Sequence, residues 1–157
     1  MSFLTRIVDG VCNGAAHQHS GCAQQILSFC HELGWEPRWV RDAIVLEFAA
    51  HSREYELSIH QAQDGNNPLF LCLSRFSAPA TCVPADILGF LLKRNGQTVP
   101  MAWQAVETER EGLISFSVRY LAFAEGLDAQ VFGHISKEML CEVIAFDDVM
   151  LSRGVIR

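Results

Sequence analysis

The sequence predicts an α+β domain in which three helices pack on an antiparallel sheet. Two patterns carry this prediction. Several runs alternate apolar and polar residues, as strands with one wet face do, and three segments repeat apolar residues every three or four positions, as helices do. The 157 residues are half hydrophobic and contain no internal repeat or linker, so we expect one core. The predicted order of elements is α-β-β-β-α-β-β-α.

The beginning of the chain predicts an arm followed by a helix. We expect residues 1–19 to form a loosely ordered N-terminal arm and residues 20–157 to form the single domain. Ser20 is a residue type that caps helices, and apolar residues recur at helical spacing after it. Gly34 is expected to end this helix, and Pro37 prevents it from resuming.

Three strands are expected next. In the first of them, Val40 falls on the same side as Ile44, whereas Trp39 falls on the opposite side. The second has the cleanest alternation in the chain. The three predicted ranges are 39–48, 53–61 and 69–76.

The second half of the chain predicts a helix, a strand pair and a long final helix. The first helix is expected from Pro84 to Asn95, with a buried stripe of Ile87, Leu88, Leu91 and Leu92. Strands follow over about 101–109 and 113–123. Asp128 is predicted to cap the last helix, which runs to about Leu151. Its predicted apolar stripe is Phe132, Ile135, Met139, Val143, Phe146 and Met150.

The spacing of apolar residues and turns between residues 83 and 151 carries a family resemblance. A helix ending Leu91-Leu92-Lys93-Arg94-Asn95 leads into a strand pair with an acidic-Gly turn, and the serine-flanked strand Leu113-Ile-Ser-Phe-Ser117 and the long helix complete the pattern. This layout is similar to that of the type III secretion chaperone fold and of the related YbjN-like proteins. The resemblance implies a five-stranded antiparallel sheet packed by helices, a homodimer, and binding of an unfolded polypeptide segment on apolar surface without catalysis or ATP. YbjN-like proteins share the architecture without a defined biochemical role.

The charge of the chain argues against two classes of partner. The net charge is −6, and Lys93-Arg94 is its one adjacent basic pair, so we expect neither nucleic acid nor an anionic membrane as a partner. Asp9 and Gly10 interrupt the first apolar run before a secretory signal can form. We therefore expect a cytoplasmic protein, and its six cysteines, none in a Cys-x-x-Cys pair, are expected to be reduced.

Three patterns were weighed as chemical sites. His17-x-His19-x-x-Cys22 has good zinc ligands but no fourth ligand at the usual spacing, so no metal is predicted. Cys30 with His31, and Cys72 with His60, contain the residue types of a nucleophile and its base, but both cysteines fall on apolar stripes.

Neighbouring carboxylates were the third pattern. They occur at Asp147-Asp148, Glu54/Glu56 and Glu107/Glu109, and all are interpreted as solvated. The sequence therefore predicts no enzyme and no cofactor.

The remaining candidates are large apolar residues on the predicted strands. Trp39, Met101 and Trp103 fall opposite the main core stripe and are the predicted partner-binding residues. The alternative, that these residues pack within the chain, stays open. The predicted function is a non-enzymatic homodimeric module that binds another polypeptide. A YbjN-like regulatory or scaffolding protein is the first alternative, and a small thiol- or zinc-dependent enzyme is the distant one.

Overall fold

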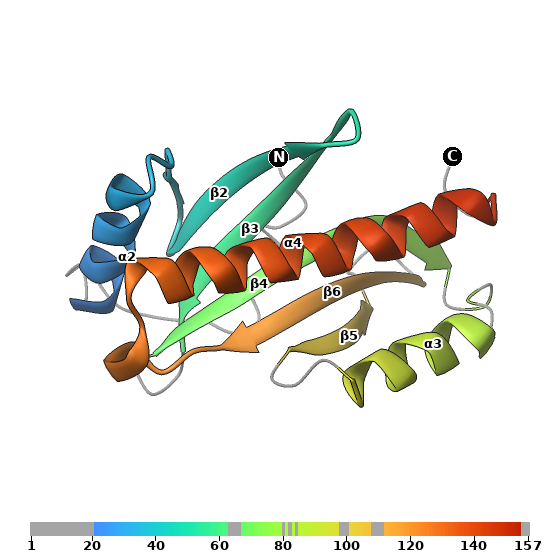
Figure 1. The fold of residues 1–157 in the computed structure, drawn as a ribbon. Helices are drawn as coiled ribbons and strands as arrows, with labels where there is room; N and C mark the ends of the chain where they lie inside the picture. The colour runs from blue at the N-terminus through green and yellow to red at the C-terminus, as the bar shows by residue number, and fades with distance from the viewer. Residues whose placement is uncertain are drawn as a thin grey trace.

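The structure is a computed structural model of the chain and describes residues 21–62, 67–79, 81, 83, 85–97, 101–107 and 112–154. Its centre is a twisted sheet with the helices on one side (Figure 1). The predicted arm, residues 1–19, lies outside these ranges, as do Ser20 and Pro84 at the expected starts of two helices.

The sheet has six strands, and every neighbouring pair is antiparallel. Their order across the sheet is β1-β2-β3-β4-β6-β5. This arrangement confirms the predicted α+β class. The strands are β1 (Arg38–Val40), β2 (Ala43–Ala50), β3 (Arg53–Gln61), β4 (Pro68–Pro79), β5 (Ala102–Glu107) and β6 (Leu113–Leu121).

The single strand predicted over 39–48 is wrong, because the chain reverses direction within it. Arg41 has a left-handed φ of 57°, and together with Asp42 it makes a two-residue turn that pairs β1 back onto β2. Trp39 is therefore the cross-strand partner of Ile44 and shares its face, the opposite of the predicted orientation. The extra strand also gives six strands in place of the five implied by the family resemblance.

The three helices of the described residues lie on one face of this sheet (Figure 1). α4 is capped as predicted, because the Asp128 carboxylate accepts a hydrogen bond of 2.8 Å from the Val131 N–H. The first helix ends two residues before Gly34, whose φ of 69° suits a helix terminus. The helices are α2 (Gly21–Glu32), α3 (Ala85–Asn95) and α4 (Ala129–Ser152), with a 3-10 turn at Ala124–Gly126.

The core lies between α4 and the sheet. All six residues of the predicted α4 stripe are buried, which confirms that prediction. Phe146 is the centre of an aromatic cluster, with its ring centroid 4.7 Å from that of Trp103 and 5.5 Å from that of Phe116. The end of α2 packs closely on the N-terminal part of α4. A Cβ on Gly133 would lie 3.2 Å from the side chain of Leu33, the residue that follows α2. None of the described helices is long and apolar enough to span a bilayer.

Candidate functional site

Trp103, one of the predicted partner-binding residues, lies inside the core. Its side chain is 5% exposed and packs on Phe146. Its backbone N–H and C=O bond to the Asn95 side chain at 2.6 and 3.0 Å, so the end of α3 holds this part of the edge strand β5. Met101 is half-buried and packs against the same core. The geometry favours the core alternative for both residues.

Trp39 is the predicted residue that remains on the surface. Its side chain is 43% exposed, although it belongs to the sheet face that the helices cover. β1 is only three residues long and forms one edge of the sheet, so nothing in the described structure extends the sheet beyond it. The exposed part of this indole offers an apolar contact surface of the kind that partner proteins bury.

A second apolar surface lies on α3, where the sequence predicted burial. The structure buries Ile87 and Leu91, but Leu88 is 42% exposed and Leu92 is 73% exposed. The prediction of a four-residue buried stripe was therefore half wrong. Leu88 and Leu92 lie one turn apart, and the exposed small residues Ala85 and Gly89 share their side of the helix. We call this set (Ala85, Leu88, Gly89 and Leu92) the outer stripe.

The outer stripe is held in a fixed orientation by polar contacts to α4. The Arg94 guanidinium binds both oxygens of the Glu142 carboxylate, with Nε 3.2 Å from Oε2. At the other end of α3, Asp86 pairs with Arg153. A bidentate contact of this kind fixes the geometry of both groups. The apolar stripe therefore faces outward on a helix that is attached at both ends.

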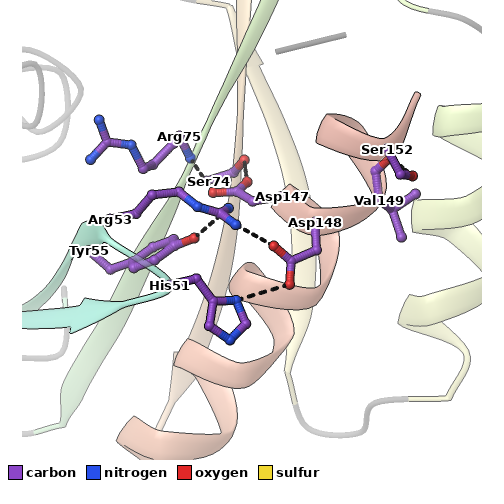
Figure 2. A network of polar contacts seen from close by, with 9 residues as sticks. All are labelled: His51, Arg53, Tyr55, Ser74, Arg75, Asp147, Asp148, Val149 and Ser152. Carbon is purple, nitrogen blue, oxygen red and sulfur yellow. Dashed lines mark hydrogen bonds and ion pairs between the residues drawn. The ribbon is translucent and has the colours of Figure 1, made fainter. Parts of the chain in front are cut away.

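A buried polar network lies between α4 and the strands β3 and β4 (Figure 2). The sequence predicted Asp147 to be solvated, and that prediction is wrong, because its side chain is fully buried. Its carboxylate accepts hydrogen bonds from the Ser74 hydroxyl and, at 3.1 Å, from the Arg75 N–H. The pairing of β4 with β6 is irregular between Leu73 and Ser77, so Asp147 satisfies a strand N–H at a β-bulge. The buried carboxylate of Asp147 therefore has a structural role, because its two hydrogen bonds connect α4 to β4.

The environments of the two adjacent aspartates differ. Burial raises the pKa of Asp147, and the bonds from Ser74 and Arg75 oppose this shift only in part. The hydrogen bond from Arg53 lowers the pKa of Asp148. Figure 2 shows the two carboxylates pointing to different partners, Asp147 toward β4 and Asp148 toward Arg53 and His51. The oxygens of Asp147 are occupied and shielded from solvent, so the pair is not arranged for acid/base chemistry.

The turn that carries His51 is strained. His51 and Ser52 both have left-handed φ angles, 51° and 61°, in the two-residue link between β2 and β3. Such turns favour Asn-Gly, because other side chains are disfavoured in this conformation. His51 Nδ1 lies 3.3 Å from the Asp148 carboxylate. The contacts of Asp148 with His51 and Arg53 therefore attach this hairpin to α4.

The cysteine and histidine pairs are not arranged as nucleophile and base. Burial raises the pKa of the Cys30 thiol to about 11 and that of Cys72 to about 12. Cys72 pairs with Leu57 across the sheet and His60 pairs with Leu69, so their side chains lie on opposite faces. His60 Nε2 instead lies 3.0 Å from the Ser58 hydroxyl, which donates to the Leu71 carbonyl at 3.3 Å.

In the part of the chain that the structure describes, no group of three His, Cys, Asp or Glu side chains could hold a metal ion. His17 and His19 lie outside that part, so the geometry of the predicted zinc-ligand pattern with Cys22 is not defined.

Two solved structures share this fold. No protein-family model and no curated protein sequence matches the chain. A chain of the HopA1–SchA chaperone–effector complex superposes with a TM-score of 0.59 at 12% identity, over 85% of this chain and 99% of that chain. YbjN, a proposed transcription regulator from E. coli, superposes with a TM-score of 0.55 at 13% identity, over 83% of this chain and 92% of that one. The predicted fold resemblance is confirmed. At these identities the similarity establishes the fold alone.

Proposed function

We propose that this chain is a cytoplasmic, non-enzymatic module that binds another polypeptide and works as a homodimer. The exposed indole of Trp39 at the β1 edge carries the partner-binding part of the proposal, and the outer stripe, with two exposed leucines, carries the dimer. The similarity to a chaperone–effector complex supports a polypeptide as the partner. The raised pKa values of the Cys30 and Cys72 thiols and the shielded carboxylate of Asp147 support a binding role in place of catalysis.

The outer stripe is the surface we assign to the dimer. In a two-fold symmetric contact the same patch meets itself, so each Leu88 and Leu92 would pack against the stripe of the second copy. Ala85 and Gly89 leave room for the two helices to approach closely. Fully burying one leucine contributes about 1.5–3 kcal/mol, and four of them would form the centre of the interface.

The partner polypeptide is assigned to the edge at β1. An extended segment can place an apolar side chain on the exposed indole of Trp39 at this edge. This assignment keeps partner binding and dimerisation on different surfaces, because β1 and β5 are the opposite edges of the sheet and α3 packs beside β5. Loss of one activity therefore leaves the other intact.

The dimer is tested by comparing Leu92→Glu with the native chain in analytical ultracentrifugation. Leu92 is mostly exposed in the single chain, so the variant keeps its helix content by circular dichroism, and we expect it to be monomeric. Ser28→Glu, at an exposed position on α2, is the matched control and should stay dimeric. A native chain that is monomeric at tens of micromolar, or a Leu92→Glu variant that still dimerises, contradicts the assignment.

A YbjN-like regulatory or scaffolding role is the alternative, and it is favoured by the similarity to YbjN. The two functions differ in the state of the partner. A chaperone-like module binds an isolated extended segment of its partner at least as tightly as the folded partner. A regulatory module binds the folded partner and loses affinity when that partner is unfolded.

A further inference from the structure

The two edges of the described sheet differ in what they offer to another strand. β1 has three residues and β5 has six, and residues 101–106, which include most of β5, carry no charge. An edge strand presents backbone N–H and C=O groups that can pair with a strand of another chain. Short uncharged segments rich in apolar residues pair in this way most readily. β5 is therefore the edge that is more open to pairing between copies of the chain.

The hydrogen bonds of Trp103 show which backbone groups of β5 point away from the sheet. In an antiparallel pair, residues that bond to the neighbouring strand alternate with residues whose N–H and C=O point outward. Both backbone groups of Trp103 bond to the Asn95 side chain, so Trp103 is an outward residue. By the same alternation Ala105 and Glu107 are also outward residues, and Ala105 is exposed.

The Asn95 carboxamide makes the two bonds to Trp103 that a residue of an added strand would make. Its oxygen accepts from the Trp103 N–H at 2.6 Å, and its nitrogen donates to the Trp103 C=O at 3.0 Å. Two residues in a hydrogen-bonded antiparallel pair exchange the same donor and acceptor. Asn95 thus takes the place of a strand residue at one of the three outward positions of β5.

The end of α3 holds this carboxamide in place. α3 lies beside β5 (Figure 1), and Asn95 is its last residue. The preceding residue, Arg94, binds both carboxylate oxygens of Glu142 on α4. A strand of another chain can bond to Trp103 only by displacing the Asn95 carboxamide and, with it, the end of this helix.

We propose that the Asn95 carboxamide closes the β5 edge against β5 of a second copy of this chain. In an antiparallel contact about a two-fold axis at Ala105, each Trp103 would pair with Glu107 of the second copy. All three outward residues then have a partner in one register, which makes a second β5 the strand that fits this edge. Asn95 prevents the two outer pairs. The inference uses neither the outer stripe nor Trp39, so it does not depend on the function proposed above.

The test compares Asn95→Ala and Asn95→Asp with the native chain. Ala removes both bonds to Trp103, whereas the Asp carboxylate can accept from the N–H but has no hydrogen for the C=O. Lys93→Ala, at an exposed position in the same turn of α3, is the matched control. Each isotope-labelled chain carries a photo-cross-linking amino acid at Ala105 and is mixed with the unlabelled, probe-free form of the same variant. Mass spectrometry then identifies links between copies.

We expect Asn95→Ala to give links from position 105 to residues 102–107 of the second copy, in amounts that increase with protein concentration. Asn95→Asp should give fewer such links, and the native chain and Lys93→Ala none. The same pattern is expected when Leu92→Glu is also present, so a failure of the proposed outer-stripe dimer leaves this result unchanged. The proposal is overturned if Asn95→Ala gives no links to these residues, or if the native chain gives as many.

Hydrogen exchange at the Trp103 amide separates pairing from a general loss of structure. In dilute Asn95→Ala this amide should exchange faster than in the native chain by about a factor of ten, because it has lost its acceptor. Its protection should return at high protein concentration, when the second copy supplies an acceptor. Exchange in Asn95→Ala that does not depend on concentration contradicts the proposal. Loss of the folded circular dichroism spectrum in both Asn95 variants also overturns it, because Asn95 would then be required for the fold itself.

Discussion

Removing the Asp147 carboxylate should destabilise the fold by an amount that depends on what replaces it. Asp147 accepts the Arg75 N–H at the β-bulge and the Ser74 hydroxyl, and both bonds are inaccessible to solvent. In Asp147→Ala both donors lose their acceptor, and each unsatisfied buried donor costs about 1–3 kcal/mol. In Asp147→Asn the side-chain oxygen can still accept from Arg75, while the amide donates to Ser74.

The expected costs follow from this difference. We expect Asp147→Ala to lower the free energy of unfolding by about 2–4 kcal/mol, since the removal of a buried charge offsets part of the loss. Asp147→Asn should stay within about 1 kcal/mol of the native chain, because it keeps the bonds and removes the charge. Both variants retain the apolar stripe of α4.

Urea denaturation, monitored by circular dichroism, gives the free energy of unfolding of both variants. Ser74→Ala with Asp147→Ala completes a double-mutant cycle, and the two residues should show coupling because they share a hydrogen bond. The structural explanation of Asp147 fails if Asn costs as much as Ala, or if Ala costs less than about 0.5 kcal/mol.

The raised pKa of Asp147 also predicts the direction in which the free energy of unfolding changes with pH. The folded state raises the pKa of Asp147, so its ionised form costs stability at neutral pH, and that cost disappears as the pH falls through the raised value toward 3.8. The native chain should therefore gain stability relative to Asp147→Asn as the pH falls from 7 toward 4. Asp148 behaves in the opposite way, because its pKa is lowered: its contribution is complete above 3.8 and is lost below that value. A native chain that loses stability relative to Asp147→Asn as the pH falls from 7 to 4 refutes the account of Asp147.

Three further results are expected. Trp103→Ala should cost about 3–5 kcal/mol of stability in urea unfolding. Trp103→Phe should cost much less, since it keeps the aromatic contact and removes a buried indole N–H that has no hydrogen-bond partner among the described residues. Ser52→Gly should stabilise the chain by about 1 kcal/mol in the same assay, because it relieves a left-handed φ, and a loss of stability would contradict the strain argument. Iodoacetamide at pH 8 should modify the exposed Cys141 in the native chain and Cys72 only after unfolding, and early loss of the Cys72 thiol by mass spectrometry would show that its burial is wrong.

The order of the elements could be predicted because the signals for it are local. Alternation in residues 53–61 and the three- and four-residue spacing of α4 each arise within one element, and both elements formed as expected. The turn at Arg41 and Asp42 could not be predicted, since neither residue is the Gly or Asn that usually marks a two-residue hairpin. As a result the side on which Trp39 lies was also misassigned.

The features of the candidate site depend on contacts between distant parts of the chain. Asp147 is buried because it meets a β-bulge 72 residues away, and nothing in its own helix indicates that bulge. α3 has apolar residues on most of its circumference, so the sequence could not show which half faces Phe146 and which half, with Leu88 and Leu92, faces outward. The hydrogen bonds between the Asn95 side chain and the Trp103 backbone could not be predicted either, because Asn at that position indicates only the end of a helix.

The central claim, binding of a polypeptide at the β1 edge, is tested most directly by affinity capture with matched variants. Tagged native chain, Trp39→Ala and Leu92→Glu are used to capture proteins from native lysate, and an enriched protein is then assayed as purified folded protein and as extended fragments by calorimetry. We predict one strongly enriched partner whose extended fragment binds the native chain and Leu92→Glu, with a large loss of affinity in Trp39→Ala. No enriched partner, or equal binding by Trp39→Ala, would contradict the account.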